Sequence, residues 1–132
     1  MIVFDASAIV SAALKADSVP ERALLRADEA DVLALSAEVD AEIAEVLGRP
    51  KFAHVISRAR RERFLEILRR AAVWFEPTLR VADCCDQKDN KYSELALAAG
   101  AEIIVSGDQD LLMLDPWRGV RILRPGDYLA VA

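Results

Sequence analysis

The sequence predicts an α/β fold, in which helices cover both faces of a parallel sheet. Short apolar segments alternate along the chain with longer segments whose apolar residues recur at helical spacing. The short segments carry few charges and have the length of buried strands, which is typical of a parallel sheet. At 132 residues the chain is expected to form one domain, residues 1–132, that buries roughly two-thirds of its unfolded surface.

The N-terminal half begins with an apolar, β-prone segment that ends at Asp5. Ser18, Pro20 and Glu21 have the order of a capping box with proline near the first helical position. A later helix is capped by Ser36 and ends at Gly48. The expected elements of this half are a strand at 2–4, a helix at 6–14, a helix from Pro20 to about residue 30, a strand at 32–35 and a helix after Ser36.

The C-terminal half contains a basic helix, a helix that Gly100 ends, and a final strand. Asp89 is placed to begin the second of these helices, which is rich in alanine and leucine. The elements expected here are helices at 57–72 and from Asp89 to Gly100, strands at 73–75, 103–105 and 120–123, and a helical turn from Pro125.

Composition excludes several classes of protein. Hydrophobic residues make up 54% and charged residues 30%, as in ordinary globular domains. No apolar run approaches the roughly 20 residues of a membrane helix, and residues 1–5 do not resemble a signal peptide, so we expect a cytoplasmic protein without membrane partners. The adjacent Cys84 and Cys85 and the single His54 offer neither a disulfide framework nor a zinc ligand set.

The net charge of −5 argues against bulk electrostatic binding of nucleic acid, but it permits an enzyme whose acids converge on a metal. Arginines are concentrated in the basic helix at 57–72. We expect them to form a solvated helix face, with phosphate steering as the alternative.

Three aspartates are expected at the ligand-binding edge of the sheet. Asp5 ends the first strand, Asp108 follows the strand at 103–105, and Asp89 begins a helix at the same edge. Each of them alone could equally be a helix cap. If the last two strands lie on the opposite side of the first strand from strands two and three, Asp5 and Asp108 meet at the topological switch point.

Several carboxylates in one place repel one another unless a cation is bound between them. Carboxylate oxygens suit Mg²⁺ or Mn²⁺, so Asp5, Asp89 and Asp108 are the predicted metal ligands. Asp110 and Ser106 are possible supporting residues, and both could equally cap the turn after the strand at 103–105.

A fourth acid is expected on the helix after Ser36. Glu42 and Asp40 flank its apolar stripe on the two sides, and helical geometry alone does not choose between them. Glu42 lies roughly 9 Å along the axis from the cap and reaches the sheet edge only if the helix tilts. A surface glutamate paired with its neighbours is the alternative.

Three segments, in order, resemble the PIN-domain family, and specifically the VapC-like ribonucleases that are toxins of bacterial toxin–antitoxin systems. They are I-V-F-D-A-S-A-I-V-S-A at 2–12, L-S-A-E-V-D-A-E-I-A-E-V-L-G-R-P-K-F at 35–52 and D-N-K-Y-S-E-L-A-L-A-A-G-A-E-I-I-V-S-G-D-Q-D-L-L at 89–112. One departure is Ala6-Ser7 where the family commonly has Thr-Asn; Ser7 keeps a polar group there.

The resemblance implies a three-layer α/β/α fold with strand order 3-2-1-4-5. It implies catalytic residues at Asp5, Glu42, Asp89 and Asp108, with Asp110 matching a further acid of many members. The implied activity is Mg²⁺- or Mn²⁺-dependent hydrolysis of phosphodiester bonds in single-stranded RNA. The implied partners are a small antitoxin and a second copy of the chain.

Two other functions fit the same residues. A PIN-fold module that binds a protein or RNA without catalysis is left open by Ala6 and the acidic composition. A receiver-like phosphoryl-transfer domain is the weaker alternative, because no well-placed lysine follows the last strand and no glycine-rich phosphate loop is present.

Overall fold

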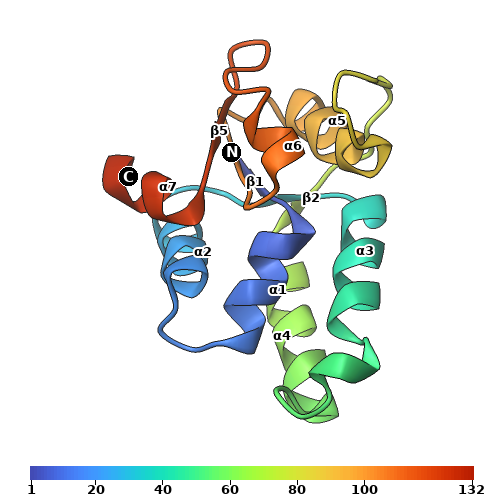
Figure 1. Ribbon diagram of the computed structural model, residues 1–132, viewed down its shortest axis with the longest axis vertical. Helices are drawn as coiled ribbons and strands as arrows, with labels where there is room; N and C mark the ends of the chain where they lie inside the picture. Colours follow the sequence, from blue (N-terminus) through green and yellow to red (C-terminus); the bar gives the residue numbers. More distant parts are fainter.

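The computed structural model describes residues 1–132 and has the predicted α/β architecture (Figure 1). The strands are β1 (Ile2–Phe4), β2 (Ala34–Leu35), β3 (Val73–Trp74), β4 (Ile103–Val105) and β5 (Arg121–Leu123). The helices are α1 (Ala6–Leu14), α2 (Val19–Ala30), α3 (Ala37–Leu47), α4 (Arg58–Ala71), α5 (Asn90–Ala99), α6 (Gln109–Leu112) and α7 (Pro125–Val131), with 3₁₀ turns η1 (Pro50–Phe52) and η2 (Gln87–Asp89). None of these helices has the length and apolar character needed to cross a bilayer.

Hydrogen bonding divides the strands into two parallel groups, β1-β4-β5 and β2-β3. The hydrogen-bonded ladders therefore do not form the predicted single sheet with strand order 3-2-1-4-5. The groups meet at one isolated parallel bridge between Ile2 and Leu33, where the Ile2 amide donates to the Val32 carbonyl at 2.9 Å. The bridge is made by Leu33, the residue before β2, and it does not extend into a ladder.

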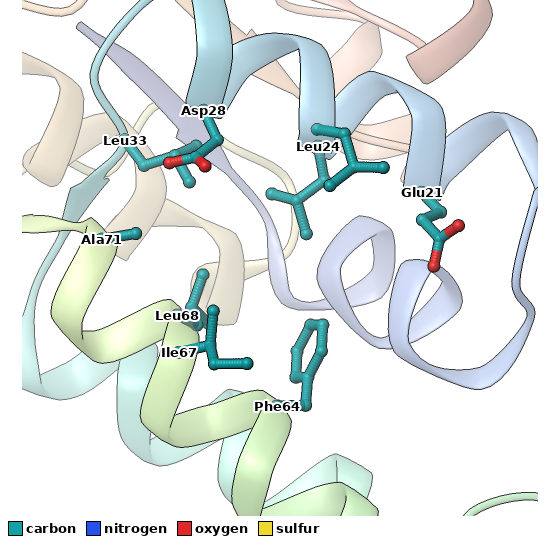
Figure 2. Close-up of a pocket in the computed structure, with 9 residues that line it drawn as sticks. Glu21, Leu24, Asp28, Leu33, Phe64, Ile67, Leu68 and Ala71 are labelled. Atoms are coloured by element: carbon teal, nitrogen blue, oxygen red, sulfur yellow. The ribbon is translucent and has the colours of Figure 1, made fainter.

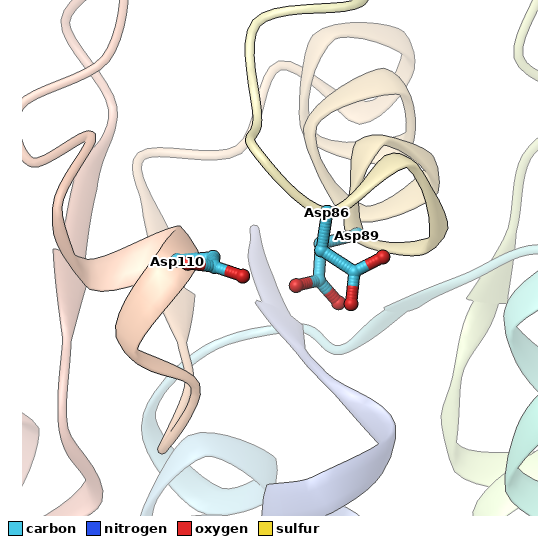
Figure 3. A group of neighbouring side chains, drawn as sticks. All are labelled: Asp86, Asp89 and Asp110. Carbon is cyan, nitrogen blue, oxygen red and sulfur yellow. The ribbon is translucent and has the colours of Figure 1, made fainter.

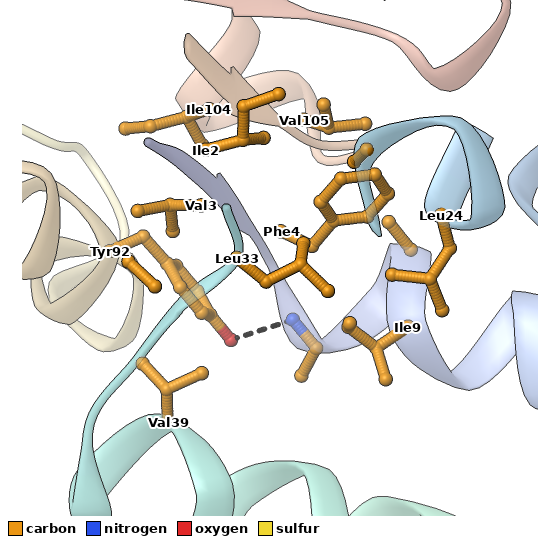
Figure 4. Packing of buried hydrophobic residues seen from close by; sticks show 14 of the residues in the cluster. Ile2, Val3, Phe4, Ile9, Leu24, Leu33, Val39, Tyr92, Ile104 and Val105 are labelled. Atoms are coloured by element: carbon orange, nitrogen blue, oxygen red, sulfur yellow. Dashed lines mark hydrogen bonds between the residues drawn. The ribbon is translucent and has the colours of Figure 1, made fainter. Parts of the chain in front are cut away.

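All three residues of β1 are buried, which explains its uninterrupted apolar sequence. Phe4 packs edge-on against Tyr128 of α7, while Val3 and the neighbouring Tyr92 of α5 lie in the same cluster (Figure 4). In Figure 4 the Tyr92 hydroxyl accepts a hydrogen bond from the Ala6 amide, at 3.1 Å. This bond joins α5 to the first residue of α1, directly beside the end of β1.

Side-chain caps fix where four of the helices begin. Asp5, Ser18, Ser36 and Ser57 each accept from the amide three residues later, at 2.8, 3.3, 3.2 and 3.2 Å. Because α1 and α3 begin at such caps and also pack against each other, their N-terminal ends are held in a fixed relation.

The C-terminal part of the fold contains more helix than the sequence indicates. The residues after β4 form the short helix α6 rather than a turn, and the turn expected at Pro125 extends into α7. Residues 87–89, which include the Asp89 expected at the start of a helix, form the 3₁₀ turn η2 that leads into α5. These short elements matter for function, because α6 and η2 carry acidic side chains.

Candidate functional site

Asp5 lies at the carboxyl end of β1 and is only 2% exposed. Its Oδ1 accepts from the Ala8 amide and the Ser7 hydroxyl, both at 2.8 Å, and its Oδ2 accepts from the Ser106 hydroxyl. Asp5 is thus a helix cap and a member of a polar cluster at the same time, so the two readings of this residue are not exclusive. Two segments fix its orientation: the start of α1, which follows β1, and the turn after β4, the strand that pairs with β1.

A chain of hydrogen bonds extends from Asp5 along the turn after β4. Ser106, which is fully buried, donates to Asp5 and accepts from the Asp108 amide at 2.9 Å. The Oδ1 atom of Asp108 accepts from the Asp110 amide at 2.8 Å and so caps α6. This turn therefore holds two more acids close to the end of β1.

Asp89 begins α5 and differs from the other acids in its hydrogen bonding. The residue is 8% exposed, and its Oδ2 atom is buried without any hydrogen-bond partner. Asp86 caps η2 by accepting from the Lys88 amide at 3.0 Å. One carboxylate oxygen from each of Asp86, Asp89 and Asp110 lies within 4.8 Å of the others, and Figure 3 shows Asp110 of α6 facing the other two.

Asp86 is the member of this group that sequence analysis did not single out. The available signal was its spacing, because Asp86 and Asp89 are three residues apart and stand on one side of a single helical turn. Residues 81–88 are polar and turn-like, and this composition alone does not distinguish Asp86 from the other polar residues around it.

Glu42 reaches the same cavity from α3. The cavity has a volume of about 260 Å³, and its walls include Asp5, Glu42, Asp89 and Asp108. Asp40, the alternative on the same helix, instead forms an ion pair with Arg69 Nε of α4, at 2.8 Å. The two sides of α3 that the sequence left open are therefore distinguished by tertiary packing.

Basic groups also line this cavity, which is therefore not uniformly negative. Arg49 and Lys88 belong to its walls together with the acids. The Arg49 guanidinium is held by Glu45, one turn earlier on α3, through Nη2 at 2.9 Å and Nε at 3.2 Å. Lys88 and the Nη1 atom of Arg49, which Glu45 does not bind, are placed to contact a phosphate group at the edge of an otherwise acidic site.

Burial, together with the crowding of acids, raises the pKa of two of them. Burial first, and then the negative charges of Asp108, Asp86 and Asp5, raise the pKa of Asp89 to about 7. Burial also raises the pKa of Asp5, against the hydrogen bonds from Ser106, Ala8 and Ser7, which favour its ionised form. A divalent cation would remove the cost of ionising such a group.

The residues present fit a hard divalent cation. The donors are all carboxylate oxygens, the set that Mg²⁺ and Mn²⁺ prefer. The buried Oδ2 of Asp89 has no protein donor to satisfy it, and a cation would do so. The acids predicted from the sequence thus lie around one cavity with an unsatisfied oxygen.

Fold and site together define an α/β protein with an acidic, cation-compatible cavity at the carboxyl edge of its parallel strands. A profile of the PIN domain matches residues 1–110, and the chain belongs to this family. PIN domains are generally metal-dependent nucleases that act on nucleic acids. No curated protein matches the chain.

Proposed function

We propose that this PIN domain is a metal-dependent endoribonuclease that hydrolyses phosphodiester bonds of single-stranded RNA in the cytoplasm. The observation that supports it most is the meeting of Asp5, Glu42, Asp89 and Asp108 at one cavity, with the buried, unpartnered Oδ2 of Asp89 among them. The choice of RNA as substrate, and the role as toxin of a toxin–antitoxin pair, rest on the resemblance of the three sequence segments to VapC-like proteins.

The proposed strand order is 3-2-1-4-5, with the single Ile2–Leu33 bridge as the junction between the two groups of strands. This order makes the end of β1 the switch point of the sheet, where ligands bind in open α/β folds. It accounts for the position of Asp5 opposite the turn that carries Asp108.

In this proposal Asp5, Asp89 and Asp108 hold Mg²⁺ or Mn²⁺, with Asp86 and Asp110 close enough to contribute. The bound ion would supply Lewis-acid stabilisation of the charge that develops on the scissile phosphate. Ser106 and Ser7 keep the Asp5 carboxylate oriented through their hydrogen bonds to its two oxygens.

The remaining polar residues of the cavity would act on the substrate. Arg49 and Lys88 would bind the RNA backbone through charge-assisted hydrogen bonds to phosphate oxygens. Because the nearby acids repel phosphate, RNA binding is expected to depend on the cation as well as on these two side chains.

The test is cleavage of single-stranded RNA with added Mn²⁺ or Mg²⁺, compared with the same protein in EDTA. We expect Asp89→Asn to lower the rate by at least about 100-fold, because the variant loses a charged ligand of the cation. Glu29→Gln, at an exposed position of α2, is the matched control and should cleave like the unmodified protein. Equal rates for Asp89→Asn and the control would assign the activity to a contaminant.

The alternative function is a PIN-fold module that binds a partner without catalysis. The observation that favours it is an apolar groove of about 200 Å³ between α2 and α4, shown in Figure 2. Its apolar lining includes Leu24, Leu33, Phe64, Leu68 and Ile67, and Ile67 is 54% exposed. Binding of a partner without any uptake of metal would support this alternative.

Within the toxin proposal, the same groove is the surface we assign to the antitoxin. Its lining is apolar, and Glu21 and Asp28 of α2 stand along its rim. An amphipathic antitoxin helix with basic residues beside its apolar face would match both features. The proposed second copy of the chain would then bind elsewhere, leaving this groove free.

Replacing a groove residue should therefore separate inhibition from catalysis. We expect Ile67→Glu to weaken inhibition of RNA cleavage by a candidate antitoxin by about 30-fold or more, the effect of losing an interface hot spot. Leu79→Glu, an exposed apolar residue outside the groove, is the control and should remain inhibitable. If the antitoxin inhibits Ile67→Glu at the concentration that inhibits the unmodified protein, the antitoxin binds another surface. If light scattering shows that Ile67→Glu has a smaller mass than the unmodified protein, the second copy of the chain binds in the groove.

A further inference from the structure

We propose that Glu42 is a positioning residue, which Lys91 and Tyr92 hold away from the cation, rather than a metal ligand. The inference rests on the proposed function, since it concerns the same cation. Helix α5, which Asp89 begins, would then also hold Glu42 of α3 through Lys91 and Tyr92.

Both carboxylate oxygens of Glu42 are already engaged by the protein. Oε1 accepts a hydrogen bond from the Tyr92 hydroxyl, and Oε2 lies 3.2 Å from the Lys91 ammonium. The contrast with Asp89 is direct, because Asp89 Oδ2 is buried and has no partner. Of these two acids, Asp89 is the one that a cation would satisfy. Both oxygens of Asp5 are engaged as well, but by neutral hydroxyl and amide donors, whereas Glu42 already has the positive charge of Lys91 as its partner.

The ion pair with Glu42 compensates the charge of a largely buried lysine, Lys91. Its side chain is only 10% exposed, and Glu42 provides its one ion pair. The ammonium also donates to the Lys88 carbonyl and lies 5.3 Å from the centre of the Tyr92 ring. Turning Glu42 toward a cation would leave a largely buried ammonium without a counter-charge, which is costly.

The partner of the other oxygen connects Glu42 to Asp5. The Tyr92 hydroxyl donates to Glu42 and at the same time accepts from the Ala6 amide at 3.1 Å. Ala6 directly follows Asp5, so Glu42, Tyr92 and Ala6 join α3, α5 and α1 at the end of β1. In this arrangement Glu42 orients the hydroxyl that fixes the backbone next to Asp5.

Calorimetric titration with Mn²⁺ alone tests this assignment without relying on cleavage. Glu42→Gln keeps an acceptor for Tyr92 and should change the Mn²⁺ dissociation constant by less than about fivefold, the effect of a charge that does not touch the ion. Asp89→Asn should weaken binding by more than about 100-fold, since it removes a ligand. An equal loss in both variants would overturn the proposal and make Glu42 a ligand.

A double-mutant cycle tests the role of Lys91. Lys91→Met releases Glu42, so we expect Mn²⁺ to bind about tenfold more tightly, through a newly available carboxylate. Lys91→Arg keeps the ion pair and should bind like the unmodified protein. In the double variant Lys91→Met with Glu42→Gln, the gain should disappear.

If the tighter Mn²⁺ binding persists in the double variant, Lys91 acts on the cation only through its charge, and the positioning role of Glu42 is wrong. Absence of Mn²⁺ binding by the unmodified protein is a different result, because it removes the proposed nuclease site itself. Thermal melts of each variant in EDTA establish that the compared proteins are folded.

Discussion

Mn²⁺ binding is expected to weaken about 100-fold between pH 8 and pH 5, because a proton competes with the cation for Asp89. The pKa of this carboxyl is raised to about 7 by burial and by the charges of Asp108, Asp86 and Asp5. Asp89 is therefore ionised in most molecules at pH 8 and in about one per cent at pH 5. Below pH 7 each further unit should cost about a factor of ten in affinity.

Calorimetric titrations at pH 5, 6, 7 and 8 measure this dependence. The Asp108→Asn variant provides an internal check, since it removes the largest electrostatic contribution to the raised pKa of Asp89. The carboxyl resonance of Asp89, followed by NMR in EDTA, should titrate at lower pH in that variant. Equal Mn²⁺ affinity at pH 5 and pH 8 in the unmodified protein would contradict the proposed role of Asp89.

Asp89→Asn is expected to make the metal-free protein more stable at pH 8, by about 2–4 kcal/mol. The folded-state pKa of Asp89 is about 7, above the model value of 3.8, so the folded protein holds a proton that the unfolded chain has released. Between about pH 4 and pH 7 this group lowers the free energy of unfolding by about 1.4 kcal/mol for each unit that the pH rises. Asparagine does not ionise and avoids that loss.

Urea unfolding of both proteins in EDTA, from pH 4 to pH 8, measures the difference. The advantage of Asp89→Asn should shrink as the pH falls toward 4, where the aspartate is protonated in the folded state. With Mn²⁺ at about 100 times the dissociation constant of the unmodified protein, that protein should gain about 2.7 kcal/mol and the variant at most about 0.4 kcal/mol. Glu29→Gln, the exposed control on α2, should stay within about 0.5 kcal/mol under all conditions.

The pH dependence of Mn²⁺ binding and the stability of Asp89→Asn together describe a site that lowers the free energy of unfolding until its cation binds. Asp89 is the clearest case, with a buried oxygen that no donor satisfies. Such a group is a common sign of a functional position, because packing and stability alone would favour a neutral side chain there.

The elements with the clearest periodicity or caps could be predicted closely from the sequence. The helices at 6–14 and after Ser36 begin and end where their caps and apolar stripes indicate. The α/β class and the PIN family were also predicted and are confirmed. Membership of the VapC-like branch remains a prediction, as do the individual roles of the site residues.

The short elements near the site could not be predicted, because they are too short for their sequence to show a helical pattern. The η2 turn has only three residues, and the hydrogen bond from the Cys84 amide to Asn90 Oδ1, at 3.0 Å, spans it. Four residues of helix, as in α6, are too few to show a period. Asp86 was missed for this reason, and Asp110 was placed only as a supporting residue.

The longer helices, the strands and the acids at their ends follow from the sequence, since caps, apolar periodicity and strand length are local properties. Which of those acids meet, and what each one contacts, depends on how the elements pack against one another. Asp40 faces Arg69 while Glu42 meets Lys91 and Tyr92, although the two acids stand two residues apart on α3. The physical reason is that partners fifty residues away on α5 set the charge and hydrogen bonding around Glu42, and no local pattern in α3 encodes them.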